Sequence, residues 1–71
     1  HIKEVACSVE GVKKVATVRA HYGGNFIHVE IHIGVDKHLL TAHSHAIGEK
    51  VSEGIESIGP IDKAFVHIDP V

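Results

Sequence analysis

The segment that decides the fold has strictly alternating character, Phe26-Ile27-His28-Val29-Glu30-Ile31-His32-Ile33. Successive side chains of a β-strand point to opposite faces, so the alternation predicts a strand with one apolar face and one face of imidazoles and a carboxylate. Residues two positions apart on one face lie about 6–7 Å from each other. A metal ion can therefore take ligands from this strand and a neighbouring one, provided that other elements supply them.

The segments before this strand predict a helix followed by another strand. Apolar residues recur at helical spacing in His1–Val9, and Gly11 follows as a terminator. Val12–Tyr22 alternates, which predicts a strand. Its apolar face is expected to hold Ala16, Val18, Ala20 and Tyr22, and its polar face Thr17, Arg19 and His21. The glycine-rich residues 23–25 then turn this strand antiparallel onto the next one, forming a hairpin.

The segments after the strand predict a long helix and a third strand. Apolar residues recur at three- and four-residue steps from Leu40 to Ile58, and Gly59-Pro60 ends this helix because proline cannot continue its hydrogen bonding. Ile61–Pro70 alternates again. Its apolar face is expected to hold Ala64, Val66 and Ile68, and its other face Phe65, His67 and Asp69.

The order of elements is helix, strand, strand, helix, strand. A strand–helix–strand crossover normally makes its two strands parallel. The third strand is expected beside the second, with His67 and Asp69 next to His28 and Glu30. Residues 1–71 are thus predicted to form one α+β domain with a three-stranded mixed sheet.

The length and the single cysteine limit how this fold can be stabilised. A chain of 71 residues buries only about 60 % of the surface that its unfolded form exposes. Such short chains commonly rely on disulfides, a metal or oligomerisation. Cys7 has no partner for an internal disulfide, and it lies off the helical stripe, so we expect a small, partly buried, inert side chain. A metal or a partner chain remains.

The composition argues against nucleic acid and favours a chain that responds to metals or pH. The formal charge is −2 and aromatic residues are 4 % of the chain, so neither a phosphate-binding stripe nor a base-stacking platform is expected. No apolar run approaches the roughly 18 residues of a membrane span. Eight histidines would move the charge from −2 to −2 + 8 = +6 if all were protonated.

Histidines and carboxylates recur on the polar faces of the predicted strands. Imidazoles and carboxylates without thiolates suit zinc and the divalent ions of iron, manganese, cobalt or nickel. An exposed histidine is more often merely solvated, but here the candidates alternate in register with core residues on two separate strands. This joint pattern predicts a metal-binding face.

The histidines of the second helix require separate interpretation. His43 lies on the apolar stripe, where it is either a hydrogen-bonded histidine at the edge of the core or a group that approaches a metal. Two residues on a helix differ by about 200°, so His45 points outward and is expected to be solvated. His38 stands at the expected cap and receives no role.

No motif for enzymatic catalysis is present. The chain has no nucleophile elbow, no Gly-x-x-x-x-Gly-Lys phosphate loop and no His-Glu-x-x-His sequence. Metal-assisted hydrolysis on the histidine-rich face is the nearest enzymatic alternative. The chain is predicted not to be an enzyme.

A set of short motifs spread over nearly the whole chain carries a family resemblance. The motifs are Gly11-Val12 with Val18-Arg19, the segment Phe26–Asp36 ending in Ile33-Gly34-Val35-Asp36, Ala42-His43, and the terminal Val66-His67-Ile68-Asp69-Pro70. Together they resemble the cytoplasmic C-terminal domain of the cation diffusion facilitator transporters. The resemblance implies an open ferredoxin-like, metallochaperone-like αββαβ domain, which forms a V-shaped homodimer below a transmembrane exporter of divalent cations.

The resemblance also implies a regulatory metal site in and beside the dimer groove. Its ligands fall on Glu30, His43, His67 and Asp69, with His28 close by. Some zinc exporters have histidine where this chain has Ala16 and Glu30, so the carboxylate with His28 beside it is more similar to the magnetosome-associated, iron-transporting branch. The bound ion is expected to be Zn²⁺, Fe²⁺ or Mn²⁺.

The resemblance therefore implies the cytosolic metal-sensing domain of an efflux transporter in an inner or magnetosome membrane. Its partners would be a second copy, divalent cations and its own transmembrane domain. A free-standing ferredoxin-like module that binds a metal or a small molecule is the competing interpretation, and an upstream sequence with several hydrophobic spans would discriminate between the two.

Overall fold

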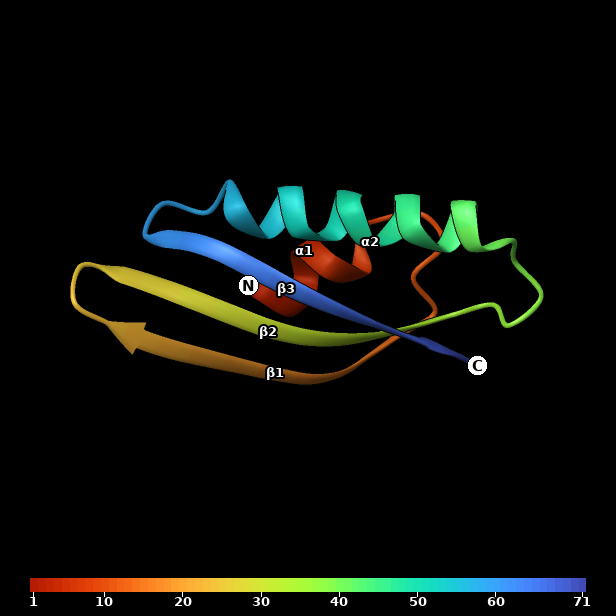
Figure 1. Ribbon diagram of the computed structural model, residues 1–71, viewed down its shortest axis with the longest axis horizontal. Helices are drawn as coiled ribbons and strands as arrows, with labels where there is room; N and C mark the ends of the chain where they lie inside the picture. Colours follow the sequence, from red (N-terminus) through yellow and green to blue (C-terminus); the bar gives the residue numbers. More distant parts are fainter.

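The computed structural model describes residues 1–71 and consists of a three-stranded sheet with two helices on one side of it (Figure 1). The elements follow in the predicted order: α1 (Ile2–Cys7), β1 (Lys14–Gly23), β2 (Phe26–Val35), α2 (Thr41–Glu56) and β3 (Ile61–Pro70). Both helices are shorter than predicted, because α1 is capped at Ser8 and α2 begins only after the extended residue Leu40. Neither helix has the length and apolar character needed to cross a membrane.

The sheet has the predicted mixed topology. Its order is β1-β2-β3, with β1 antiparallel to β2 and β2 parallel to β3. The hairpin between β1 and β2 turns at Gly24, whose φ of 59° is a left-handed conformation that glycine adopts without steric cost. The crossover through α2 makes β3 parallel to β2, as the chain order requires.

The alternation in β2 decides which face of the sheet is buried. Val29, Ile31 and Ile33 are fully buried, and they share the core with Val51 and Ile55 of α2. Complete burial of a valine or isoleucine side chain contributes about 1.5–3 kcal/mol. These contacts hold the helices against one face of the sheet and leave its other face to the polar residues.

A β-bulge in β1 overturns part of the predicted face assignment. Val15 pairs with Ile33 and Val18 with Ile31, so Ala16 and Thr17 together lie opposite a single residue of β2. Such a bulge resets the two-residue period of the strand. The prediction that Ala16 lies on the apolar face is wrong, since Val15 takes that place and Ala16 is exposed.

The expected partial burial of Cys7 is also wrong. Cys7 is exposed, and its neighbour Ala6 is the residue of α1 that enters the core. The helix is so short that only one narrow stripe of it faces the sheet and α2, and Cys7 lies outside that stripe.

Gly11, between α1 and β1, adopts a backbone conformation that other residues rarely take. Its φ is 100°, and an added Cβ would lie 2.5 Å from Cδ1 of Ile47. We expect Gly11→Ala to lower the free energy of unfolding by about 1–3 kcal/mol, measured by urea denaturation. Gly59→Ala is the matched control, because its added Cβ meets nothing within 4 Å, and it should change stability by less than about 0.5 kcal/mol. Equal unfolding midpoints for the two variants would contradict this account.

Candidate metal centre

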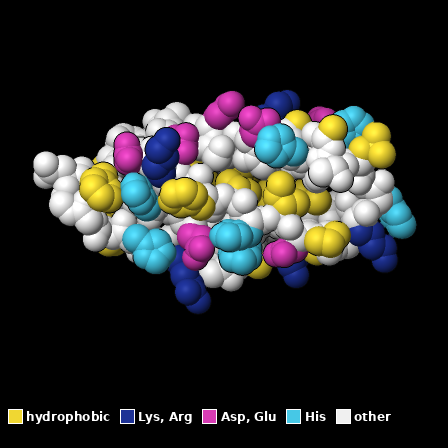
Figure 2. Space-filling view, viewed as in Figure 1, with side chains coloured by type: hydrophobic (Ala, Val, Ile, Leu, Met, Phe, Trp, Pro, Cys, Tyr) yellow, Lys and Arg dark blue, Asp and Glu magenta, His cyan; other side chains and the backbone are white.

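The face of the sheet away from the helices carries the candidate ligands, and we name it the polar sheet face. It comprises Arg19 and His21 of β1, His28, Glu30 and His32 of β2, and Lys63, Phe65, His67 and Asp69 of β3. Figure 2 shows histidine and acidic side chains next to one another over the strands. The antiparallel register sets Arg19 opposite Glu30, and the parallel register sets His32 opposite His67.

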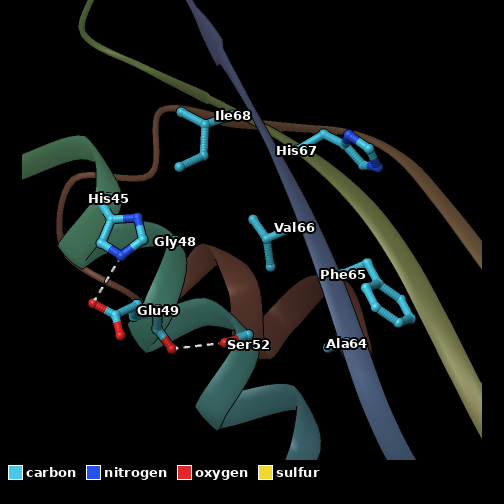
Figure 3. Close-up of a pocket in the computed structure, with 9 residues that line it drawn as sticks. All are labelled: His45, Gly48, Glu49, Ser52, Ala64, Phe65, Val66, His67 and Ile68. Atoms are coloured by element: carbon cyan, nitrogen blue, oxygen red, sulfur yellow. Dashed lines mark hydrogen bonds and ion pairs between the residues drawn. The ribbon is translucent and has the colours of Figure 1, made fainter. Parts of the chain in front are cut away.

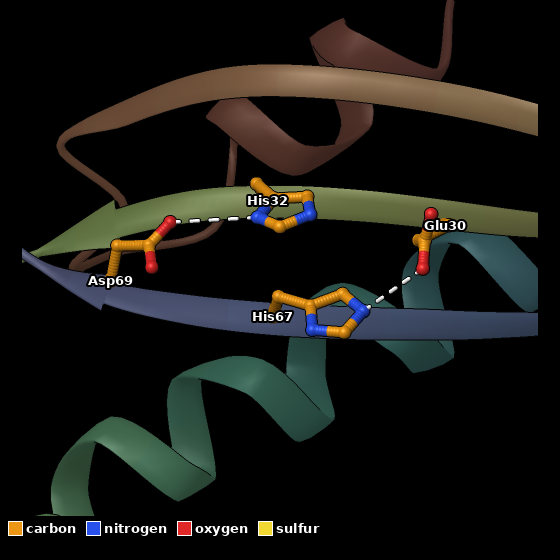
Figure 4. Close-up of polar contacts among 4 residues, drawn as sticks. All are labelled: Glu30, His32, His67 and Asp69. Atoms are coloured by element: carbon orange, nitrogen blue, oxygen red, sulfur yellow. Dashed lines mark hydrogen bonds and ion pairs between the residues drawn. The ribbon is translucent and has the colours of Figure 1, made fainter.

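Four side chains of β2 and β3 form a compact group in the middle of this face (Figure 4), which we name the central quartet: Glu30, His32, His67 and Asp69. His67 Nε2 lies 3.1 Å from Glu30 Oε2, within hydrogen-bonding distance. His32 Nδ1 lies 3.6 Å from Asp69 Oδ2. The rings of His32 and His67 are stacked with centroids 4.5 Å apart, which joins the two contacts into one group.

The separations within the quartet suit coordination of a divalent ion. Two donor atoms on one tetrahedral zinc ion, each bonded at about 2.0–2.1 Å, lie about 3.4 Å apart. The two imidazole–carboxylate contacts, at 3.1 and 3.6 Å, lie on either side of that value. As the side chains stand, however, no three His, Cys, Asp or Glu groups of the chain converge on one point. Each contact therefore offers two ligands of an incomplete coordination shell.

The expectation that His67 and Asp69 both lie beside His28 and Glu30 is correct only for Glu30 and His67. The parallel register sets His28 opposite Lys63 and places Asp69 opposite Gly34, further along β2. His28 instead contacts Asp62, with Nε2 3.5 Å from Oδ2. The structure separates His28 from the central quartet.

His43 lies on α2, whereas the quartet lies on the opposite face of the sheet. Its side chain is exposed and lines a hollow of about 300 Å³ together with Glu10, Leu39 and Lys50 among others. No side-chain hydrogen bond to His43 is present. The buried part of α2 begins only at Gly48, so His43 lies before the segment of the helix that packs into the core. The structure does not bring His43 to the other predicted ligands.

Two histidines to which the sequence assigned no metal role, His32 and His45, each contact a carboxylate. His32 is a member of the quartet. In the sequence, its position two residues after Glu30 on the alternating strand already indicated that the two side chains share a face. His45 lies 3.3 Å from Glu49 through Nε2 and Oε1, one helical turn along α2. His45 and Glu49 line a hollow of about 370 Å³ between α2 and β3, whose lining also includes His67 (Figure 3). The four-residue spacing of His45 and Glu49 in the sequence could have predicted this contact, because residues four apart are neighbours on a helix.

Comparison with known proteins agrees with this architecture. A family model described as the cytoplasmic domain of cation efflux proteins matches residues 1–71. The uncharacterized transporter MJ0449 of Methanocaldococcus jannaschii is 36% identical over 70 residues, which are 99% of this chain and 25% of that transporter. Metal tolerance protein 4 of Oryza sativa subsp. japonica is 40% identical over 58 residues, 82% of this chain and 15% of that protein. The chain thus spans a quarter or less of these relatives.

Solved structures agree as well. MamM-CTD superposes with a TM-score of 0.91 at 32% identity, covering 99% of this chain and 90% of that chain. Variants of that domain have been solved in a cadmium form and a nickel form. The open ferredoxin-like fold expected from the sequence is confirmed by this superposition, and so is the resemblance to the cation diffusion facilitators. The chain belongs to the family of cytoplasmic domains of cation efflux proteins.

Proposed function

We propose that this chain is the metal-sensing and dimerisation domain of a divalent-cation efflux transporter. The central quartet carries the proposal, because two imidazole–carboxylate contacts lie side by side on an exposed face of a transporter-family domain. The cadmium and nickel forms of the MamM domain support a divalent ion. The donor set contains no thiolate, which favours zinc, iron or manganese over soft ions.

The quartet is completed by a second copy of the chain. A structural zinc site has four protein ligands, and each imidazole–carboxylate contact supplies two. Two polar sheet faces related by a two-fold axis would bring Glu30 and His67 against their counterparts. The name of the matching family model, ZT_dimer, supports a homodimer. In this arrangement the ion takes the place of the proton that joins the His67 ring to the Glu30 carboxylate.

Metal binding closes the dimer in this proposal. Without metal, the carboxylates of Glu30 and Asp69 face their counterparts, and like charges at short range disfavour approach. An ion between the two faces replaces this repulsion with coordination bonds that form best in the closed dimer. A ligand shifts an equilibrium only through its differential affinity for the two states. Closure and tight binding therefore occur together, and closure reports cytosolic metal to the membrane domain.

The flanking histidines have a secondary place in this scheme. His43 reaches a metal in this scheme only if a partner segment or Asp69 of a second copy approaches α2, because no three ligand groups of its own chain converge there. His28 belongs to a different group of side chains on the same face. The quartet is thus the proposed centre, with Glu30, His67 and Asp69 retained from the sequence and His32 added.

Spin-label distances test dimer closure directly. A label at the hairpin tip in the Cys7→Ser/Asn25→Cys chain should show a shorter and narrower distance distribution with saturating Zn²⁺ than without it. The same labelled chain carrying Glu30→Gln and His67→Gln should show no change, because both substitutions remove ligands from the quartet. An identical distribution with and without Zn²⁺ would reject closure, and a monomer by sedimentation in both states would reject the dimer.

A further inference from the structure

A second group of metal-capable side chains lies on the polar sheet face near the hairpin, apart from the central quartet. His21 of β1 stands directly opposite His28 of β2, and His28 contacts Asp62 of β3. We infer that His21, His28 and Asp62 form a separate divalent-metal site of moderate affinity. This site does not depend on the proposed dimer, since all three ligands come from one chain.

The register of the hairpin places the two histidines at chelating distance. Directly opposite residues of an antiparallel pair have Cβ atoms about 4.5–5.5 Å apart. Two imidazoles on such positions can direct one nitrogen each to a shared ion, since donors on one zinc ion lie about 3.4 Å apart. The Nε2 of His28 and the Oδ2 of Asp62 already have nearly this separation, at 3.5 Å.

An irregularity in the β2/β3 register explains why Asp62 reaches His28. Ile27 pairs with Ile61 and His28 with Lys63, so Asp62 is an extra residue in β3. Bulges of this kind change the direction of a side chain and often occur beside functional sites. Because of this extra residue, His28 has the carboxylate of Asp62 beside it in addition to its register partner Lys63.

Aromatic contacts hold the ring of His28 in place. It stacks on Phe26 with centroids 4.6 Å apart and meets Phe65 edge-on at 5.8 Å. Both phenylalanines are large exposed apolar side chains, and the quartet does not use them. They restrict the orientation of the His28 ring and exclude water from one side of it, which strengthens electrostatic attraction between a cation and its ligands.

The site requires a movement of only one side chain. No three ligand groups converge as the side chains stand, and His21 makes no side-chain hydrogen bond or ion pair that would have to break before it turned toward His28 and Asp62. His21 is exposed, and exposed side chains exchange between staggered rotamers on a fast timescale. Lys63, opposite His28, disfavours a cation. With one carboxylate instead of the quartet's two, the site should therefore bind more weakly than the quartet.

Tyr22 provides a local reporter for this site. It is the only tyrosine in a chain without tryptophan, it follows His21 directly, and it is 79% exposed. Cu²⁺ quenches tyrosine emission at short range, and it binds imidazole ligands more tightly than the neighbouring divalent ions do. Titration of the chain with Cu²⁺ should quench Tyr22 in a saturable step.

Ligand variants distinguish this site from the quartet. We expect His21→Gln and Asp62→Asn, both at exposed positions, to raise the Cu²⁺ concentration at half-quenching by about tenfold or more. The Glu30→Gln/His67→Gln chain should retain the step even though it loses dimer closure, and His45→Gln on α2 serves as a control that leaves it unchanged. Unaltered quenching in both His21→Gln and Asp62→Asn, or loss of quenching in the Glu30→Gln/His67→Gln chain, would overturn the second site.

Discussion

Replacing His67 with alanine is expected to weaken Zn²⁺ binding by about tenfold or more, on the scale seen for residues that support a metal site. His67 contacts Glu30 at 3.1 Å and stacks on His32 at 4.5 Å, so its removal separates the two halves of the quartet. Glu30→Ala should have a similar effect, because it removes the carboxylate that accepts from the His67 ring. Isothermal titration calorimetry on the purified chain measures both affinities.

Two control variants make this experiment specific. Cys7→Ser should leave the affinity unchanged, since Cys7 is exposed on α1 and the proposed site uses no thiolate. His43→Ala should have a smaller effect than His67→Ala, because His43 lies on the helical layer beside Glu10 and Lys50. A large loss of affinity in Cys7→Ser, with His67→Ala unaffected, would exclude the quartet as the principal site.

Lowering the pH from about 8 to about 5.5 is expected to weaken Zn²⁺ binding by more than any single substitution. A neutral imidazole coordinates a metal and an imidazolium does not, so protons compete with the ion at each histidine ligand. The affinity is therefore highest at the alkaline end and falls as the histidines acquire protons. Because the quartet contains two histidines in each chain, the loss should be steep. Competition with a chelating dye at a series of pH values gives the profile.

A ligand variant again provides the control for the pH profile. In His67→Ala one histidine of the quartet is missing, so its residual affinity should depend less steeply on pH than that of the unaltered chain. An affinity that stays constant between about pH 8 and pH 5.5 would show that carboxylates alone hold the ion. In that case Glu30 and Asp69 would be the essential ligands, and the stacked histidines would have a structural role.

The order of elements and the burial of β2 were determined by the sequence alone. Local alternation decides which residues of a strand can be buried together, and Val29, Ile31 and Ile33 form the core as their pattern predicts. The crossover through α2 makes β3 parallel to β2, because a chain that returns after a helix enters the sheet in the same direction. The location of Glu30 and His67 on the same face of neighbouring strands follows from these two local facts.

The tertiary structure alone decided which polar side chains meet. Register is a property of two strands together, and no local pattern states that His32 lies opposite His67 while His28 lies opposite Lys63. Bulges add one residue to a strand and reset its alternation, which removed Ala16 from the core side of β1. Helical periodicity places His43 on an apolar stripe, but in the tertiary structure the buried part of α2 begins only at Gly48. The sequence therefore determined the fold and the chemistry of the polar sheet face, whereas the pairing between strands selected the central quartet from it.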